Sequence, residues 1–295
     1  MKFNEIEYSG KLCSKIKKYY ASYADEIGYQ EFSDQYLKAQ LENKLAKYVF
    51  EEVTSFSSQT NKMKILDIGS GLGGTVAEFR RNGIDCFGVE PNRIAIKITK
   101  DRLFEEKLGD QGVLCQGVGE SLPFHSKSFD LVCSITVIEH VKNLEEYLRE
   151  AYRVLKPDGE IFIIAPNYFS FWEGHYRLYT PPYIMYLSKG FFKLYSKLFA
   201  RNPKYTNRLN FKINPVYLKK LFRETDFKNI KDISLNRMKK LFNYPEELVD
   251  NTMREKIEKM RSNLFLRFII KTVINIIGVT KVYHPIVLIA QKLEE

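Results

Sequence analysis

The chain has 295 residues, and 44% of them are apolar, so it can bury a substantial core and wholesale disorder is excluded. The net charge of +10 is unevenly distributed, because residues 1–160 carry −3 and residues 161–295 carry +13. This asymmetry indicates an anionic partner for the C-terminal part (phosphorylated substrate, membrane surface or nucleic acid) or only a solvated basic face.

The four cysteines, Cys13, Cys86, Cys115 and Cys133, include no C-x-x-C pair. A disulfide scaffold or a zinc finger is therefore not expected, and a reducing cytosol is the expected compartment. We expect no bound metal. The first ten residues contain no apolar stretch, so no secretion signal is expected.

In chain order, Tyr36–Phe56 has apolar residues at every fourth position, which predicts one helix within a helical segment of residues 1–60. Strand and helix signals alternate from residue 62. The predicted strands are Lys64–Ile68, Asp85–Val89, Val113–Gly117, Phe129–Ser134, Glu160–Ala165, Phe227–Ser234 and Val282–Ala290. The predicted helices between them are Thr75–Asn82, Arg93–Leu108, Leu144–Leu155 and Pro215–Thr225, with a turn at Lys156–Gly159. This alternation predicts an α/β domain over residues 61–295, with a mostly parallel sheet covered by helices on both faces.

Two irregular blocks interrupt the alternation, at residues 166–214 and 235–280. We interpret both as insertions that form a cap. The second contains Leu264–Val279, which is strongly apolar but includes Arg267 and Lys271 and is too short to span a bilayer. It is either a helix packed on the core, which we favour, or an amphipathic helix at a membrane interface.

The most informative segment is Asp67-Ile68-Gly69-Ser70-Gly71-Leu72-Gly73-Gly74, a buried strand that runs into a glycine-rich turn. Glycines allow backbone N–H groups to approach a ligand closely. Glu90 follows at the end of the next strand, where an acid can accept hydrogen bonds from ribose hydroxyls. The glycines alone fit a dinucleotide or an adenosyl sulfonium cofactor. Asp67 favours the cation, because a carboxylate would repel a pyrophosphate.

The sequence resembles the class I S-adenosylmethionine-dependent methyltransferases, in the group that includes ubiquinone-pathway, small-molecule and glycan methyltransferases. The resemblance covers about residues 60–166 and rests on the ordered series D-I-G-S-G-L-G-G, V-E-P-N, E-S-L-P-F-H-S-K-S-F-D-L-V, E-H-V and R-V-L-K-P-D-G-E. It implies a Rossmann-like, seven-stranded, mostly parallel sheet with one antiparallel strand, for which Val282–Ala290 is the candidate. It also implies S-adenosyl-L-methionine as the cofactor.

The resemblance further implies a cofactor site at the ends of the first strands. Gly69 and Gly71 would approach the methionine part of the cofactor, Asp67 its amino group and Glu90 its ribose. Val118 replaces the acid that relatives often have in the adenine loop, so Glu120 or a backbone carbonyl would accept from the adenine amino group. The Gly119 N–H would serve the ring nitrogen. The full expected set is Asp67, Gly69, Ser70, Gly71, Glu90, Pro91, Asn92, Val118, Gly119, Glu120, Ser134 and Ile135.

Transfer of a methyl group to a hydroxyl requires that the hydroxyl loses its proton, which a histidine can accept. The candidates are His140, in the E-H-V segment, and His175, in the aromatic first insertion. The alternative for His140 is a local hydrogen bond at a helix start. His125 is expected in a loop, and His284 is expected to be structural.

The basic, aromatic cap suits O-methylation of a small molecule or a glycan, including a sugar linked to a carrier or a lipid. A prenylated quinone precursor is the alternative acceptor, since an apolar cap could take its tail. RNA methylation is disfavoured, because no RNA-binding module is recognisable. A catalytically silent cofactor-binding protein and a dehydrogenase also stay open. We expect a cytoplasmic protein that contacts the inner membrane face peripherally.

Overall fold

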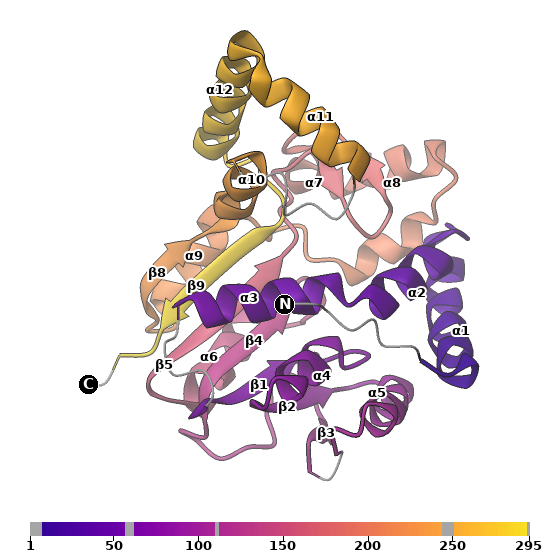
Figure 1. Cartoon of the computed structure of the whole chain (residues 1–295), viewed down its shortest axis with the longest axis vertical. Helices are drawn as coiled ribbons and strands as arrows, with labels where there is room; N and C mark the ends of the chain where they lie inside the picture. The colour runs from indigo at the N-terminus through magenta and orange to yellow at the C-terminus, as the bar shows by residue number, and fades with distance from the viewer. Residues whose placement is uncertain (1–7, 57–61, 110–111, 244–250, 294–295) are drawn as a thin grey trace.

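The computed structural model describes residues 8–56, 62–109, 112–243 and 251–293 (Figure 1). Its main sheet has seven strands in the order β3-β2-β1-β4-β5-β9-β8. Their bounds are β1 (Lys64–Ile68), β2 (Asp85–Glu90), β3 (Leu114–Gln116), β4 (Phe129–Ile135), β5 (Leu155–Ala165), β8 (Lys228–Asp232) and β9 (Ile286–Gln291). Only β9 runs against its neighbours, β5 and β8. The predicted Rossmann-like fold with one antiparallel strand is confirmed.

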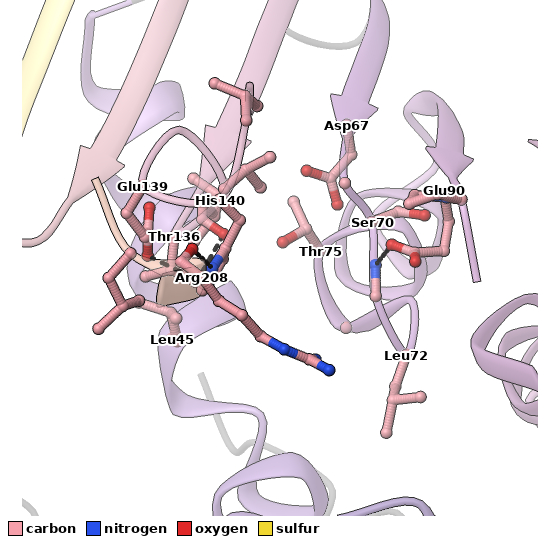
Figure 2. Close-up of a pocket in the computed structure, with 18 of the residues that line it drawn as sticks. Leu45, Asp67, Ser70, Leu72, Thr75, Glu90, Thr136, Glu139, His140 and Arg208 are labelled. Carbon is pink, nitrogen blue, oxygen red and sulfur yellow. Dashed lines mark hydrogen bonds and ion pairs between the residues drawn. The ribbon is translucent and has the colours of Figure 1, made fainter. Parts of the chain in front are cut away.

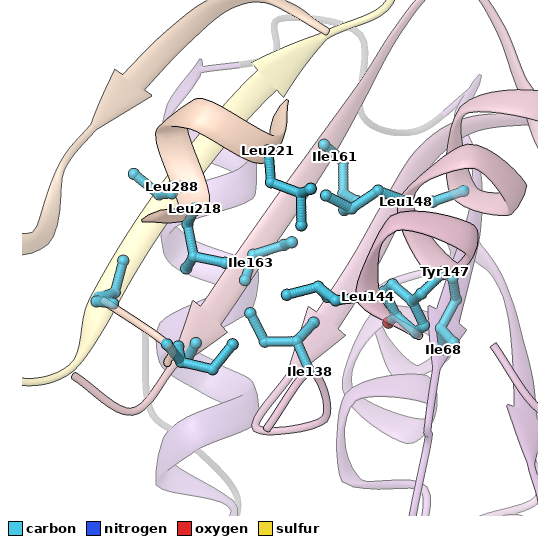
Figure 3. Packing of buried hydrophobic residues seen from close by; sticks show 14 of the residues in the cluster. Ile68, Ile138, Leu144, Tyr147, Leu148, Ile161, Ile163, Leu218, Leu221 and Leu288 are labelled. Atoms are coloured by element: carbon cyan, nitrogen blue, oxygen red, sulfur yellow. The ribbon is translucent and has the colours of Figure 1, made fainter. Parts of the chain in front are cut away.

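Helices cover both faces of this sheet, as predicted. Val49 in α3 (Lys44–Phe56) and Phe79 in α4 (Gly74–Arg81) pack on one face, against side chains such as Ile65 and Phe162. The alternate strand residues Leu66 and Ile163 face the other way, toward α6 (Leu144–Val154) and α9 (Pro215–Glu224). Figure 3 shows this second layer, in which Leu144 and Leu148 of α6 meet Ile161, Ile163 and the α9 leucines Leu218 and Leu221. The period of two along each strand therefore separates the two hydrophobic layers.

The other elements lie before β1, after β2 and within the two expected insertions. They are α1 (Gly10–Ile27), α2 (Phe32–Glu42), α5 (Arg93–Glu105), α7 (Ile184–Leu187), α8 (Lys189–Leu198), the 3-10 helix η2 (Pro203–Arg208), α10 (Ser234–Asn243), α11 (Asn251–Ser262), α12 (Leu264–Thr280) and the hairpin strands β6 (Trp172–Glu173) and β7 (Leu178–Tyr179). The expected boundaries of the N-terminal segment and the insertions stay predictions.

The expectation of one helix over Tyr36–Phe56 is wrong, because Asn43 separates α2 from α3. Asn43 has φ +51°, a left-handed conformation that asparagine tolerates better than most residues. Its side-chain amide donates a hydrogen bond to Glu78 of α4 (2.8 Å), which holds the break in place. Leu45, which the four-residue pattern placed on the buried face, is 44% exposed as a result.

The predicted turn at Lys156–Gly159 also differs, since β5 already begins at Leu155. Leu155 pairs with Phe129, and the register shifts before Glu160 pairs with Leu131. The turn residues are accommodated as an irregularity within the pairing, anchored by hydrogen bonds from Lys156 Nζ to the Asp130 carboxylate. The residues that predicted a turn at this position instead form an irregularity within the strand pairing, of the kind seen at β-bulges.

The favoured interpretation of Leu264–Val279 as a core-packed helix is wrong. Among the described residues of α12 only Ile274 is buried, whereas Leu264 and Val279 are each 82% exposed. Figure 1 shows α11 and α12 projecting away from the sheet. Within the described parts of the chain, no helix has both the length and the apolar character that crossing a bilayer requires.

Candidate functional site

A cleft with a volume of about 1420 Å³ opens at the C-terminal ends of β1, β2 and β4. Most small-molecule sites have volumes of ~300–1,000 Å³, so this cleft has room for a cofactor and an acceptor together. Figure 2 shows its two sides: Asp67, Ser70 and Glu90 lie on one, here called the Asp67 side. Glu139 and His140 lie opposite, on what is here called the His140 side.

The glycine-rich turn after β1 forms the Asp67 side. Gly69 and Gly71 have φ values of +70° and +52°, which favour glycine. A Cβ on Gly69 would lie 2.5 Å from the Val137 side chain, so this position accepts no larger residue without movement. A Cβ on Gly71 would meet only the Gly69 carbonyl oxygen, 4.0 Å away, among the described residues. The backbone at Gly71 is therefore open toward the cleft.

Two buried carboxylates face the cleft beside this turn. Glu90 accepts hydrogen bonds from the N–H groups of Gly71 (3.0 Å) and Asn92 (2.9 Å), which ties the turn after β1 to the end of β2. Asp67 Oδ1 and Ser70 Oγ are buried without a hydrogen-bond partner in the described chain. Burial, followed by the charge of Glu90, raises the pKa of Asp67 to about 8, although a hydrogen bond from Thr75 opposes this shift.

This side of the cleft is suited to a cation. Burial also raises the pKa of Glu90, although the N–H groups of Asn92 and Gly71 oppose this shift. Both carboxylates are therefore costly to ionise together in the absence of a cation. A positively charged ligand with N–H or O–H donors would stabilise both charges. It would also satisfy the two polar atoms that the protein leaves unpaired.

The structure separates the expected cofactor residues into two groups. Asp67, Gly69, Ser70, Gly71, Glu90, Pro91 and Ile135 line the cleft. Asn92, Val118, Gly119, Glu120 and Ser134 are not among its lining residues. The second group supports the first, and its cofactor contacts stay predictions.

Four contacts show what this supporting group does. The Asn92 side chain caps α5 by accepting from the Ile94 and Ala95 N–H groups. Glu120 accepts from the Lys142 N–H (2.9 Å), and Ser134 accepts from the Tyr147 hydroxyl (2.6 Å). A Cβ on Gly119 would collide with the Tyr147 ring at 2.2 Å, so this glycine is required by packing. Val118 is 46% exposed.

The structure brings the two candidate histidines together on the His140 side. His140 follows β4, and His175 lies in the turn between β6 and β7, yet their Nε2 atoms are 3.3 Å apart. His175 Nδ1 lies 2.8 Å from Glu173 Oε1, and His140 Nδ1 lies 3.3 Å from the Arg208 carbonyl oxygen. His125 is exposed in a loop, and His284 Nδ1 accepts a hydrogen bond from the Asn167 N–H (3.4 Å).

Two acids of this cluster, Glu139 and Glu173, were not predicted from the sequence. Glu139 lies in the E-H-V segment itself, but an acid next to a histidine carries no signal of its own. Burial raises the pKa of Glu139 to about 7, against the opposing charge of His175. Burial also acts to raise the pKa of Glu173, yet His175 and neighbouring N–H groups hold it below its ordinary value. His140 has its pKa lowered to about 4 by burial and by the charge on His175.

The pattern of hydrogen bonds assigns the protons of the two rings. The Arg208 carbonyl can only accept, so His140 Nδ1 carries a hydrogen and its Nε2 is free to accept. His175 then donates from Nε2 to His140 and from Nδ1 to Glu173, which makes it an imidazolium. Its pKa is raised by Glu173 and Glu139 even though burial acts in the opposite direction.

Glu139, His140 and His175 also form a group that could hold a metal ion, one ligand atom from each.

The N-terminal helices contribute to the lining of the cleft, which was not predicted from the sequence. Its lining there includes Tyr19, Tyr20, Tyr23, Tyr36 and Gln40, from α1 and α2. Tyrosines at helical spacing in a segment without other motifs resemble ordinary core residues, so sequence gave no signal for this role.

With this geometry established, comparison with known proteins identifies the class. Residues 66–163 match the family model described as a methyltransferase domain. The structure also resembles the YcgJ protein of Bacillus subtilis (TM-score 0.52, 16% identity, 84% of this chain and 100% of that chain), which shows the same fold. Residues 66–163 therefore match a methyltransferase domain, and the structure has the fold of the class I S-adenosylmethionine-dependent methyltransferases.

Two further proteins are similar to this chain, one in sequence and one in structure. The mitochondrial ubiquinone biosynthesis O-methyltransferase of Rattus norvegicus is 35% identical over 108 residues, which are 36% of this chain and 31% of the relative. Phosphoethanolamine N-methyltransferase 2 of Haemonchus contortus, solved with S-adenosyl-L-methionine, has a TM-score of 0.52 at 17% identity (84% of this chain, 53% of that chain). The sequence match thus spans about a third of the O-methyltransferase.

Replacement of Asp67 by asparagine should flatten the pH dependence of stability. The folded pKa of Asp67 is about 8, against an ordinary value of 3.8, so the folded state binds this proton more tightly than the unfolded state. The contribution of Asp67 to the free energy of unfolding therefore falls as the pH rises from about 4 to about 8. Urea denaturation at several pH values in this range should show that the free energy of unfolding falls less with rising pH in Asp67→Asn than in the parent protein.

Asp85→Asn is the matched control, because the Asp85 side chain is 75% exposed at the start of β2. It should leave the pH profile of the parent unchanged. Equal profiles for the parent and Asp67→Asn would contradict the raised pKa.

Proposed function

We propose that this chain is an S-adenosylmethionine-dependent methyltransferase that O-methylates a small-molecule or glycan acceptor. The observation that carries the proposal is the pair of buried carboxylates, Asp67 and Glu90, beside the open backbone of Gly71. When bound, S-adenosylmethionine supplies a methyl group on a sulfonium, which is already a good leaving group. It also brings an ammonium group and two ribose hydroxyls.

The residues on the Asp67 side fit this cofactor. The unpaired Oδ1 of Asp67 would accept from the ammonium group, and the unpaired Ser70 hydroxyl would bind a neighbouring polar atom. Each Glu90 oxygen accepts one backbone N–H and retains a lone pair for a ribose hydroxyl. Asn92, Val118, Gly119, Glu120 and Ser134 would act mainly by supporting the loops that carry these groups.

The acceptor would enter from the His140 side. We assign His140 and His175 to activation of its hydroxyl, since His140 lines the cleft across from the Asp67 side and His175, which does not line it, contacts His140 from behind. An O-methyltransferase among the relatives supports an oxygen acceptor, and the aromatic, basic first insertion supports a sugar, including one on a carrier or a lipid. The prenylated quinone precursor stays the second candidate, supported by the same relative.

Glu90→Ala should weaken the binding of S-adenosylmethionine by about tenfold or more, because it removes hydrogen bonds to a charged acceptor. Calorimetry measures this, with Glu224→Ala on the exposed end of α9 as a control that binds like the parent. The parent should bind S-adenosylmethionine and not NAD. Tight binding of NAD alone would contradict the proposal.

Transfer of label from methyl-tritiated cofactor into a fractionated cell extract tests the acceptor class. We expect the label in a small-molecule or lipid-linked glycan fraction and its loss with Glu90→Ala. Label in the quinone fraction would select the second candidate. Label in RNA, or none above the Glu90→Ala background, would contradict both.

A peripheral contact with an anionic membrane is part of the same proposal, and two exposed apolar stripes support it. On α12, Phe265, Phe268, Val273 and Ile276 are 70%, 68%, 45% and 55% exposed, at spacings that place them on one helix face. On α8, the exposed residues Phe191, Leu194 and Leu198 follow the same kind of spacing.

Basic residues accompany both stripes. Lys189, Lys193 and Lys197 belong to α8, and Arg267 and Lys271 belong to α12. Apolar side chains flanked by lysine and arginine fit the headgroup region of a bilayer that contains anionic lipids. The charge of +13 on residues 161–295 supports this partner over an acidic protein groove, because it is spread over both insertions.

Flotation with vesicles of phosphatidylcholine and phosphatidylserine tests this contact. The parent protein should float with these vesicles, and less with phosphatidylcholine alone or at high salt. Phe268→Asp and Leu198→Asp should each reduce flotation, since each places a charge in one apolar stripe. Phe104→Asp on α5, which is 81% exposed outside both stripes, should behave like the parent. Absence of flotation by the parent would contradict the membrane contact.

A further inference from the structure

Three metal-ligating atoms converge where β4 meets the hairpin of β6 and β7. His140 Nε2 and His175 Nε2 are 3.3 Å apart, and Glu139 Oε1 lies 4.0 Å and 3.9 Å from them. A point equidistant from these atoms lies about 2.2 Å from each, which is close to the ~2.0–2.2 Å at which zinc binds imidazole and carboxylate ligands. The triangle has the size that a single divalent cation requires.

The partners behind the two histidines hold the rings in the orientation of metal ligands. Glu173 Oε1 binds His175 Nδ1 at 2.8 Å, and the Arg208 carbonyl oxygen binds His140 Nδ1 at 3.3 Å. Each ring therefore has its Nδ1 occupied and directs its Nε2 to the common point. Metal binding would displace the Nε2 proton of His175 to solvent, so that both rings ligate as neutral imidazoles. A carboxylate or carbonyl behind the distal nitrogen is the usual arrangement around a ligating histidine, and it fixes the tautomer.

Glu139 is the second, independent observation. Its side chain is fully buried, and neither carboxylate oxygen has a hydrogen-bond partner among the described residues. The nearest cation in the described chain is the His175 imidazolium, whose Nε2 lies 3.9 Å from Glu139 Oε1 without a hydrogen bond. A metal ion at the common point would lie within bonding distance of this carboxylate and would compensate its burial more fully. His140, by contrast, retains 37% of its side-chain exposure and lines the cleft, so the common point is accessible from the acceptor side.

We infer that Glu139, His140 and His175 bind one divalent transition-metal cation, for which zinc is the natural probe. Two imidazoles and one carboxylate are a ligand set of catalytic zinc sites, which keep a further position open. The inference rests on the proposed function, because the acceptor oxygen would take that open position.

The step at this site balances without another reactant. Metal coordination favours loss of the hydroxyl proton, which passes to solvent. The acceptor oxygen then forms a bond to the methyl carbon while the carbon–sulfur bond breaks, and the electron pair stays on sulfur. The products are the methyl ether, the neutral thioether and one proton. Glu173 is then a positioning residue, since it acts through His175.

Zinc binding to chelator-treated full-length protein tests the site, measured by competition with a chromophoric chelator. We expect one bound zinc per chain. Replacement of a residue that only hydrogen-bonds to a metal ligand typically weakens metal binding ~10–100-fold, and we expect a loss in this range for Glu173→Gln. Glu139→Gln and His140→Gln should each weaken zinc binding by more than this. Cobalt in place of zinc should give the visible absorption of a four- or five-coordinate site, and His140→Gln should abolish it.

His125→Gln is the matched control, because His125 is exposed outside the cluster, and it should bind zinc like the parent. Circular dichroism of each variant shows whether it folds, and Glu173→Gln provides a second route should a ligand variant unfold. Zinc binding no tighter in the parent than in His140→Gln would overturn the inference. Binding of S-adenosylmethionine by the metal-free protein separates the outcomes, since its absence with and without zinc would contradict the proposed function instead.

Discussion

The burial of two acids at the ends of neighbouring parallel strands is the constraint on which the site depends. β1 and β2 pair so that Asp67 lies beside Gly88 and Ile68 beside Val89. This register brings Glu90 next to the turn after β1, where it accepts the Gly71 N–H. Asp67, which also faces the cleft, has one oxygen without a hydrogen-bond partner in the described chain. Like charges in a region of low dielectric are costly, and a cationic ligand with hydrogen-bond donors removes that cost.

The cover of the cleft is assembled from segments far apart in the chain. Arg208 of η2 pairs with Glu26 of α1 at 2.9 Å, and the Asn202 N–H donates to the Ile27 carbonyl at 2.8 Å. Asn202 Nδ2 also donates to the Glu26 carbonyl. These contacts join the N-terminal helices to the segment that carries Arg208, whose carbonyl binds His140. The N-terminal helices thus contribute to the lining of the cleft on the side where we propose that the acceptor binds.

Local signals were sufficient for the sheet and for the Asp67 side. The glycine turn, Asp67 and Glu90 lie in strands whose apolar runs and boundaries are readable from their own residues, and parallel pairing then brings them together. Asn43 was missed because the four-residue pattern runs unbroken through it, while the contact that stabilises its left-handed conformation comes from Glu78. The break between α2 and α3 is therefore a tertiary effect.

The His140 side was only partly predictable for a different reason. His140 and His175 are 35 residues apart, and Glu173 is hydrogen-bonded to His175, which in turn contacts His140. No spacing rule connects these residues, because the hairpin of β6 and β7 that presents His175 lies in an insertion. The expectation of no metal rested on the absence of closely spaced ligands. A site assembled from a strand end and a distant turn leaves no such pattern.

The charges on the two sides of the cleft impose a direction on the proposed reaction. The Asp67 side offers two carboxylates and suits the cationic cofactor, while the His140 side combines His140 with the Glu139 carboxylate, a pair that can activate an oxygen nucleophile. In-line displacement at carbon requires the nucleophile opposite the leaving sulfur, so it must approach from the His140 side. An acceptor held there would extend toward the insertions, where the excess positive charge is found. A neutral, fully enclosed substrate would gain nothing from that charge, whereas a phosphate-bearing or membrane-linked acceptor would be attracted by it.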